Sequence, residues 1–492
     1  MKLKVKSLDW DAGIPISMID DETAKKMDIR TNDRINIKID HKELVTVVDI
    51  VGDLIKKDEI AVSNEIFKRL KLKKGQEVDI NLAMPPNSTG FVKKKLDGES
   101  LKKNEIEEIL EDIVLNSLSE SEIALFVAGM YKNGMTFKET TYLIDGILKT
   151  GNKLKLNKKL IVDKHSIGGV PGKITPIVVS ICVAAGLTMP KTSSRAITSS
   201  AGTADSIETV AEVDFSTEEL EKIVKKVGGC FVWGGGLEMV PADSKIIQVE
   251  KKLNLDPEAQ LLASIMSKKL AAGSNYIVLH FPYGKYAKVS KEKAEKLKSK
   301  FERLGKHFDK EIKCVLSHNK GPYGEGVGPI LEMIDAIKVL DPDKKGPRKL
   351  EKESIKLAGE LLEMTKRANK SEGKKLANEL LSSGKAFEKF KEIVKAQRGK
   401  IKDLDNLKPA PVKKTIYSKR SFKIKEIDNN SINSTARFAG CPSDKDAGLY
   451  LYFHEGEKVK KGDKLITIYS ESKSRLKQAE DYFNKNFSFK EE

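Results

Sequence analysis

Cysteine is scarce in this chain of 492 residues, which contains four, Cys182, Cys230, Cys314 and Cys441. They lie far apart and form no C-x-x-C pair, so the sequence predicts neither a disulfide framework nor a structural zinc site. Isolated thiols are typical of a reducing compartment, and we expect a cytoplasmic protein. No apolar run approaches the roughly 18 residues of a membrane-spanning helix. The opening residues, MKLKVKSLDWDAGI, lack the apolar segment of a signal peptide.

Acidic residues are outnumbered: 72 Asp and Glu stand against 89 Lys and Arg, which gives a net charge of +17. A positive surface attracts phosphates, nucleic acid or acidic membranes, and its sign alone does not choose among them. A generally lysine-rich composition explains the excess equally well. The basic residues are spread among acidic ones, and no basic motif is interleaved with aromatic residues. This distribution argues against nucleic acid as a partner.

A chain of this length predicts three domains or slightly more, at roughly 150 residues each. Residues 1–85 contain short runs of β-branched residues between charged turns, which predict a small β-rich domain similar to a barrel. These runs lie at 34–39, 43–51, 59–63 and 77–84. A helical domain is expected over 86–158, because apolar residues recur there at helical spacing and Ser119 and Thr136 precede two of the runs.

Residues 159–408 alternate between strand and helix patterns, and we expect a large α/β domain with a mixed sheet. Its first strand, 160–162, runs into a glycine-rich loop and then an apolar helix, an arrangement that turns backbone N–H groups outward. A lysine-rich stretch with two prolines, 405–415, marks the last linker. Beyond it, 409–492 predicts a small α+β domain.

The loop after the first strand reads Lys164-His165-Ser166-Ile167-Gly168-Gly169. Its glycines let the backbone approach an anion closely, its serine hydroxyl donates a hydrogen bond, and its lysine supplies a positive charge. The loop is not a Walker A motif, because no G-x-x-x-x-G-K-[ST] occurs in the chain. Taken alone, it is more simply explained as a βα turn that requires glycine.

A second loop, 193–205, contains several hydroxyl groups, one arginine and a glycine. A solvent-exposed loop can have this composition, but two anion-suited loops after two strands of one domain are harder to dismiss. We therefore hypothesise that both loops converge on one oxyanion. No cluster of carboxylates or histidines has the spacing of metal ligands, so we expect no metal site.

The two motifs, K-x-S-x-G-G after a strand and S-S-R-A-I-x-x-x-A-G-T-x-D-x-I-E, resemble the signature of the thymidine and pyrimidine nucleoside phosphorylase family. Ser200 stands where Thr or Ala is usual. Residues 263–270 and 324–329 match further stretches of the family, with Glu325 in place of a residue that is usually basic. The resemblance spans roughly 88–480. The N-terminal 85 residues and Val170-Pro171-Gly172 point to the archaeal branch that acts on nucleoside 5′-monophosphates.

The resemblance implies a reaction in which inorganic phosphate cleaves the N-glycosidic bond of AMP, and also of CMP or UMP. The products are the free base and ribose 1,5-bisphosphate, in nucleotide catabolism, and no cofactor is needed. It also implies a homodimer or higher homo-oligomer, a helical domain joined by a segment near 241–272, and a hammerhead-like C-terminal domain. The alternatives are a pyrimidine nucleoside phosphorylase acting on thymidine or uridine and, third, a phosphoribosyltransferase.

The resemblance also assigns residues. The positions that match phosphate ligands are Lys164, Ser166, Ser193 and Thr203. The positions that match nucleotide contacts are Gly168, Ser194, Arg195, Ala196, Ile197, Thr198, Ser199, Thr203, Ser264 and Lys288. Lys268 matches a residue that faces the base and lies four residues from Ser264, on the same helical face. His165 is expected to contact the base or ribose, or else to be a structural histidine.

Asp256 matches the proton donor of the family. An aspartate that acts as an acid near neutral pH must be buried or placed beside a like charge. Asp256-Pro257-Glu258 is also a good helix start, so an N-cap is the alternative role. By an ungapped count, Val249 stands where pyrimidine enzymes have an arginine that binds the base. The loss of that donor argues against strict thymidine or uridine recognition.

Overall fold

The computed structural model describes residues 1–12, 15–196, 199–237 and 239–491. The chain forms two compact units. The first contains residues 1–151 and 240–264, and the second contains residues 152–239 and 265–492. None of the described helices combines the length and apolar character needed to cross a membrane.

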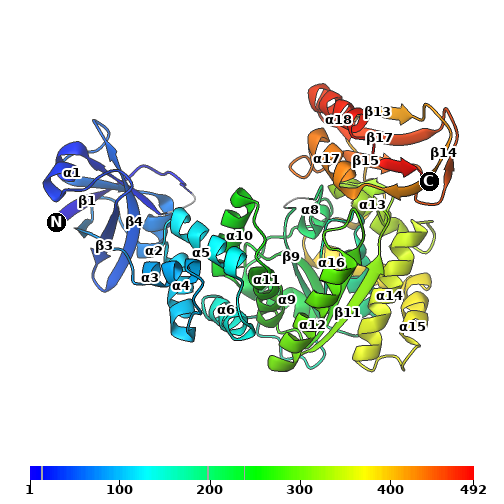
Figure 1. Cartoon of the computed structure of the whole chain (residues 1–492), viewed down its shortest axis with the longest axis horizontal. Coiled ribbons are helices and arrows are strands. Elements are labelled where there is room, and N and C mark those ends of the chain that lie inside the picture. The colour runs from blue at the N-terminus through cyan, green and yellow to red at the C-terminus, as the bar shows by residue number, and fades with distance from the viewer. Residues whose placement is uncertain (13–14, 197–198, 238, 492) are drawn as a thin grey trace. The chain divides into compact units, whose positions relative to one another are not determined.

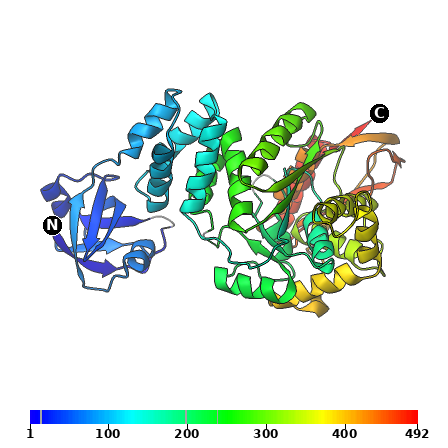
Figure 2. The same cartoon turned by 90° about the horizontal axis from the view of Figure 1, so that it is seen from below.

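The described part of residues 1–85 forms a closed barrel, drawn in blue in Figures 1 and 2, with strand order β1-β5-β2-β4-β3-β6. Its strands are β1 (Lys2–Ser7), β2 (Ile16–Asp20), β3 (Arg34–Ile39), β4 (Lys42–Val51), β5 (Glu59–Val62) and β6 (Glu77–Leu82), with helices α1 (Asp21–Met27) and α2 (Asn64–Leu70). The four runs of β-branched residues correspond to β3 to β6. Strand β1 was not expected, because its sequence KLKVKS is half lysine, yet Leu3 and Val5 alternate into the core.

A helical bundle completes the first unit. Its helices are α3 (Ser88–Leu96), α4 (Lys103–Leu115), α5 (Glu120–Asn133), α6 (Phe137–Lys149) and α10 (Pro241–Leu253). Ser119 and Thr136 each cap a helix, and a glutamate three residues later accepts a hydrogen bond from the backbone N–H of the cap residue. Lys245 of α10 donates to the carbonyl oxygens of Ile113 and Val114, both at 3.0 Å. These carbonyls lie in the last turn of α4, where the regular helical hydrogen bonds run out, so Lys245 joins α10 to the bundle.

The second unit is built around parallel strands. β11 (Glu311–His318), β10 (Tyr276–Tyr283) and β7 (Val162–Ser166) form one sheet, and β8 (Met189–Ser193) pairs with β9 (Gly229–Trp233). A parallel bridge between Ile161 and Thr188 links the two sets. The expected mixed sheet is therefore wrong for the described strands of this core, because helical crossovers between successive strands return the chain to the same edge.

Helices connect these strands and pack against them or against one another. They are α7 (Ile174–Ala184), α8 (Thr203–Ile207), α9 (Thr217–Val227), α11 (Glu258–Ala271), α12 (Lys291–His307), α13 (Pro329–Leu340), α14 (Arg348–Met364), α15 (Gly373–Ser382) and α16 (Lys385–Ala396), followed by a short 3-10 turn, η1 (Ile401–Asp403). Helix α7 is the apolar helix predicted after the first loop, and its residues 174–183 are all buried. Burial of this whole helix fixes the loop that precedes it.

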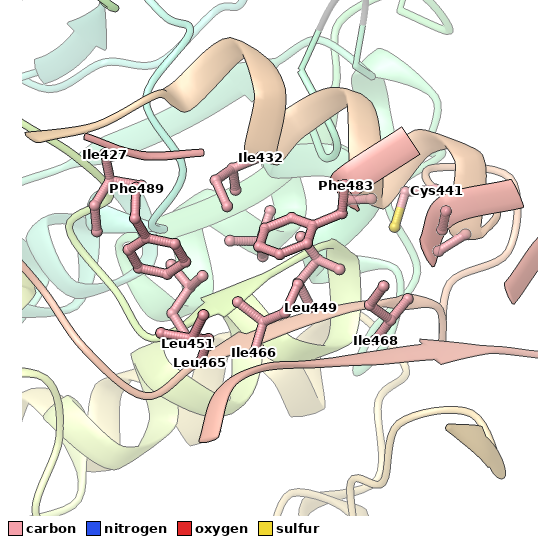
Figure 3. Close-up of a cluster of buried hydrophobic side chains, with 14 of the residues drawn as sticks. Ile427, Ile432, Cys441, Leu449, Leu451, Leu465, Ile466, Ile468, Phe483 and Phe489 are labelled. Carbon is pink, nitrogen blue, oxygen red and sulfur yellow. The ribbon is translucent and has the colours of Figure 1, made fainter. Parts of the chain in front are cut away.

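The C-terminal part has its own core. Its elements are β13 (Val412–Tyr417), β14 (Phe422–Ile427), α17 (Asn429–Ala439), β15 (Gly448–Leu451), β16 (Lys458–Val459), β17 (Lys464–Ser470), α18 (Lys473–Lys485) and β18 (Phe489–Glu491). Figure 3 shows Phe483, Phe489, Leu449 and Ile466 pointing toward one another. Strand β12 (Gly326–Val327) pairs with β15 and so anchors the 324–329 loop to this part.

Candidate active site

Two adjacent parallel segments bring the predicted loops to one edge of the sheet. The backbone N–H of Val162 donates to the carbonyl of Thr188 at 2.9 Å, and the N–H of Thr188 donates to Leu160 at 3.1 Å. Strand β7 ends at Ser166 and β8 ends at Ser193. Because parallel strands end on the same side, the first and second loops begin next to each other.

A buried ion pair holds the two loops together. Lys173, which precedes α7, donates from Nζ to the carbonyl of Ala201 at 3.0 Å and to Oε2 of Glu332 at 2.8 Å. The same carboxylate oxygen accepts the N–H of Gly172 at 2.7 Å. Lys173 and Glu332 are both buried. One carboxylate of α13 thus fixes the end of the first loop against the second.

Beneath the loops lies a buried cluster of lysines. Asp163 of β7 is fully buried and accepts hydrogen bonds from Lys191 at 3.1 Å and Lys269 at 2.5 Å. Burial alone would raise the pKa of the Asp163 carboxyl, but the two lysines hold it below its usual value. Burial, with repulsion from Lys191 and Lys173, lowers the pKa of Lys164 to about 7. The region therefore has an excess of positive charge that an anion would balance.

Each serine at the end of a strand has a defined partner. The hydroxyl of Ser166 lies 3.2 Å from Nδ1 of His280, which is completely buried on β10. The hydroxyl of Ser193 donates to the carbonyl of Val232 at 3.3 Å. Together with Lys164, these side chains come from adjacent strand ends, as an anion site requires.

The second loop is folded around Asp205. This carboxylate accepts the N–H groups of Ala196 at 2.7 Å and Gly202 at 2.8 Å. A Cβ on Gly202 would lie 2.4 Å from the carbonyl oxygen of Ser194, so only glycine fits there. Arg195 forms two hydrogen bonds with Glu208, at 2.6 and 2.7 Å, and lies over the Trp233 ring.

The other predicted nucleotide contacts of this loop differ in exposure. Ser194 is exposed, whereas Ser199 is partly buried and donates to Ala201 at 3.2 Å. Thr203, a predicted ligand of both phosphate and nucleotide, begins α8 and is partly buried. Ile197 and Thr198 lie outside the described residues.

The remaining candidates of the second unit lie in the first loop or beside it. Gly168 is exposed, and the backbone of Lys288 lies beside Gly169, within 3.6 Å of a Cβ built on that glycine. Burial and nearby lysines, with Lys269 and Lys191 foremost, hold the pKa of His165 well below its usual value. His165 is therefore neutral near pH 7, which suits a hydrogen bond to a base or ribose but not a cationic acid.

Three candidates are associated with α11. Asp256 is exposed and directly precedes Pro257, after which the helix begins at Glu258. Ser264 is buried in the helix, and Lys268 follows one turn later and is partly exposed. Asp256 and Ser264 belong to the first compact unit, and Lys268 belongs to the second.

Sequence reasoning missed several residues that organise the site. They are Asp163, Lys173, Lys191, Lys269, His280, Glu332, Glu353 and Asn433. Asp163 had a usable signal, since a charge inside the apolar run LIVDKH demands a buried partner. Asn433 had none, because it lies 233 residues from Ser200, which it contacts.

Glu325, whose role the sequence left open, accepts a hydrogen bond from Tyr450 of β15. Among the described residues, no group of three or more His, Cys, Asp or Glu side chains could hold a metal ion.

Family models match three parts of the chain. Residues 89–151 match the glycosyl transferase family helical bundle domain, and residues 158–387 match the glycosyl transferase family a/b domain. Residues 423–490 match the pyrimidine nucleoside phosphorylase C-terminal domain. Among solved structures, anthranilate phosphoribosyltransferase from Thermus thermophilus is similar, with a TM-score of 0.52 over 63% of this chain and 99% of that chain. Its sequence identity of 20% makes this a likeness of fold alone.

Curated relatives match almost the whole chain. The AMP phosphorylase of Thermococcus kodakarensis is 43% identical, over 97% of this chain and 95% of its own. The AMP phosphorylase of Pyrococcus horikoshii is 44% identical over the same shares. That of Methanococcus vannielii is 40% identical, again over 97% and 95%. The chain belongs to the AMP phosphorylase family.

Proposed function

We propose that this protein catalyses the phosphorolysis of AMP, and also of CMP or UMP, to the free base and ribose 1,5-bisphosphate. The observation that carries the proposal is the meeting of two loops at one edge of the sheet, joined by Lys173 and placed above a buried excess of lysine charge. The near full-length similarity to AMP phosphorylases supports the same reaction.

The chemistry explains why such a site is needed. Cleavage of the N-glycosidic bond builds positive charge on the ribose and negative charge on the departing base, while phosphate attacks C1′ from the opposite face. The enzyme must hold an anion close to that carbon and must supply a proton to the base. Lys164, Ser166, Ser193 and Thr203 hold inorganic phosphate in our proposal. Because phosphate is the nucleophile, we propose that the reaction requires neither metal nor cofactor.

We assign a second set of residues, around the proposed phosphate ligands, to the binding of the nucleotide. Gly168, the segment 194–199, Thr203, Ser264 and Lys288 contact AMP, while Lys268 and His165 face the base. Lys288 is exposed and its backbone lies beside Gly169, which supports its assignment to a ligand on the first loop. Asp256 donates the proton to the leaving base. We further propose that closure over the substrate gives this exposed carboxyl the dry environment that a proton donor needs.

We retain the predicted domain limits, 1–85, 86–158 with a segment near 241–272, 159–408 and 409–492, and a hammerhead-like C-terminal domain. The grouping of 240–264 with the first 151 residues supports the shared helical domain. A homodimer or larger homo-oligomer and a cytoplasmic location complete the proposal, with no nucleic acid or membrane as partner.

A substrate series tests the proposed function. AMP, CMP, UMP, adenosine and uridine are each incubated with the protein and phosphate, and base release is measured. We expect nucleotides to exceed nucleosides by roughly 10²-fold or more, since a site built for a charged 5′-phosphate is left unpaired by a nucleoside. The burial of Val249, where pyrimidine enzymes have an arginine, favours this outcome. Faster cleavage of uridine than of any nucleotide would instead establish a pyrimidine nucleoside phosphorylase.

A further inference from the structure

Ser166 is hydrogen-bonded to a histidine that is itself held by a carboxylate. Ser166 and His280 are direct neighbours across the parallel pair β7–β10. Nδ1 of His280 lies 3.2 Å from the Ser166 hydroxyl, and Nε2 lies 3.1 Å from Oε1 of Glu353. The histidine is completely buried, so these contacts decide which ring nitrogen carries hydrogen.

Glu353 is an ionised acceptor in this arrangement. Its Oε1 accepts the hydroxyl of Ser317 at 2.5 Å and the ammonium of Lys356 at 3.3 Å, in addition to His280. Burial would raise the pKa of the Glu353 carboxyl, but the hydrogen bonds from His280 and Ser317 lower it to about 2. An ionised carboxylate only accepts hydrogen bonds, so Nε2 of His280 must carry a hydrogen.

His280 is neutral near pH 7. Burial lowers its pKa to about 4, with the charges of Lys164 and Lys356 acting in the same direction and Glu353 opposing them. The Tyr323 hydroxyl, 3.5 Å from Nε2, faces the ring as well. A neutral imidazole with its hydrogen on Nε2 has a lone pair on Nδ1. The Ser166 hydroxyl therefore donates its only hydrogen to His280.

A serine that has given its hydrogen to His280 presents only lone pairs to other ligands. We propose that His280 and Glu353 make Ser166 a hydrogen-bond acceptor toward the bound anion, so that the site selects an oxyanion carrying its own O–H group. This inference rests on the proposed function, in which Ser166 binds inorganic phosphate. His280 and Glu353 act as positioning residues through Ser166 rather than by touching substrate.

The selection has a clear chemical meaning. Near neutral pH, inorganic phosphate and arsenate retain a hydroxyl hydrogen, whereas sulfate has none. The phosphate ester of a nucleotide, whose second pKa is about 6, has also lost its hydrogen. The site therefore distinguishes the attacking phosphate from sulfate and from the 5′-phosphate of AMP, because an acceptor facing an acceptor leaves both unpaired.

Binding of inorganic phosphate, arsenate and sulfate is measured by calorimetric titration and as KM or inhibition constant in the AMP reaction, near neutral pH. The wild type is expected to bind phosphate and arsenate at least about tenfold more tightly than sulfate. Ser166→Ala is expected to lower the affinity for phosphate about tenfold and to leave the affinity for sulfate unchanged. Thr203→Ala is the matched control. In our proposal the Thr203 hydroxyl donates to the bound anion, and both anions can accept, so its loss is expected to lower the affinity for phosphate and for sulfate equally.

His280→Phe keeps a ring of similar size and leaves Glu353 with Ser317 and Lys356. It frees the Ser166 hydroxyl, so sulfate is expected to bind about tenfold more tightly than in the wild type. If Ser166→Ala lowers the affinities for phosphate and for sulfate equally, the inference is overturned. This result does not depend on whether the His280→Phe variant folds. Wild-type protein that binds no phosphate and releases no base would overturn the proposed function itself. Phosphate-dependent activity without anion selectivity would overturn only the inference.

Discussion

The side-chain oxygen of Asn433 accepts two hydrogen bonds from Ser200, one from the backbone N–H and one from the hydroxyl, each at 3.0 Å. The amide nitrogen of Asn433 donates to the carbonyl of Gly169, also at 3.0 Å. A residue of α17 in the C-terminal part therefore spans both loops of the candidate site. This part of the chain therefore contributes to the geometry of the candidate site as well as to its own core.

Asn433→Ala is expected to raise KM for phosphate about tenfold, because small displacements of binding groups are costly. It leaves the buried polar groups of Ser200 without their acceptor, which should reduce the free energy of unfolding by about 1–3 kcal/mol. Steady-state kinetics and denaturant unfolding measure the two effects. Asn430→Ala changes an exposed residue of the same helix and serves as the control. Unchanged phosphate kinetics in Asn433→Ala would remove the proposed role of this residue.

Lys173→Met is expected to lower the free energy of unfolding by about 3–5 kcal/mol, since it leaves the buried Glu332 carboxylate without its cation. Lys252→Met breaks an exposed pair with Glu120 and is expected to cost at most about 1 kcal/mol. Urea denaturation compares the two variants. Equal losses would contradict the assignment of Lys173 as a buried link between the loops.

Phosphate binding is expected to take up a proton above pH 7. Lys164 has a pKa of about 7 in the free protein, and a bound anion favours its charged form. Above that pKa the free amine must gain a proton to pair with phosphate, so the contribution of Lys164 to affinity falls as the pH rises. Titrations in buffers of different ionisation enthalpy count the protons. The same uptake in Lys164→Gln would show that another group is responsible.

Asp256→Asn is expected to lower kcat by about 10²-fold or more, because an amide cannot donate the proton that an acid supplies. Asparagine caps helices as well as aspartate does, so the variant should unfold at the same denaturant concentration as the wild type. Glu258→Gln is a matched control at the start of the same helix. Full activity in Asp256→Asn would leave only the helix-capping role.

Local sequence patterns predicted the two loops, because strand, glycine-rich turn and apolar helix are all short-range features. They also predicted strands β3 to β6 and the caps at Ser119 and Thr136. Long-range partners were not predictable in this way. Asn433 and Glu332 act on loops 233 and 159 residues away, and nothing in their own neighbourhood indicates it. The parallel pairing of the core strands was also missed, since a strand pattern does not show its neighbour's direction.

The most direct test of the central claim is the fate of AMP with and without inorganic phosphate. We predict that adenine and ribose 1,5-bisphosphate form in equal amounts, and only when phosphate is present. In Lys164→Ala and Thr203→Ala the rate of product formation is expected to fall strongly. Adenine release without phosphate, or ribose 5-phosphate as the sugar product, would contradict the account, because water rather than a bound phosphate would then be the nucleophile.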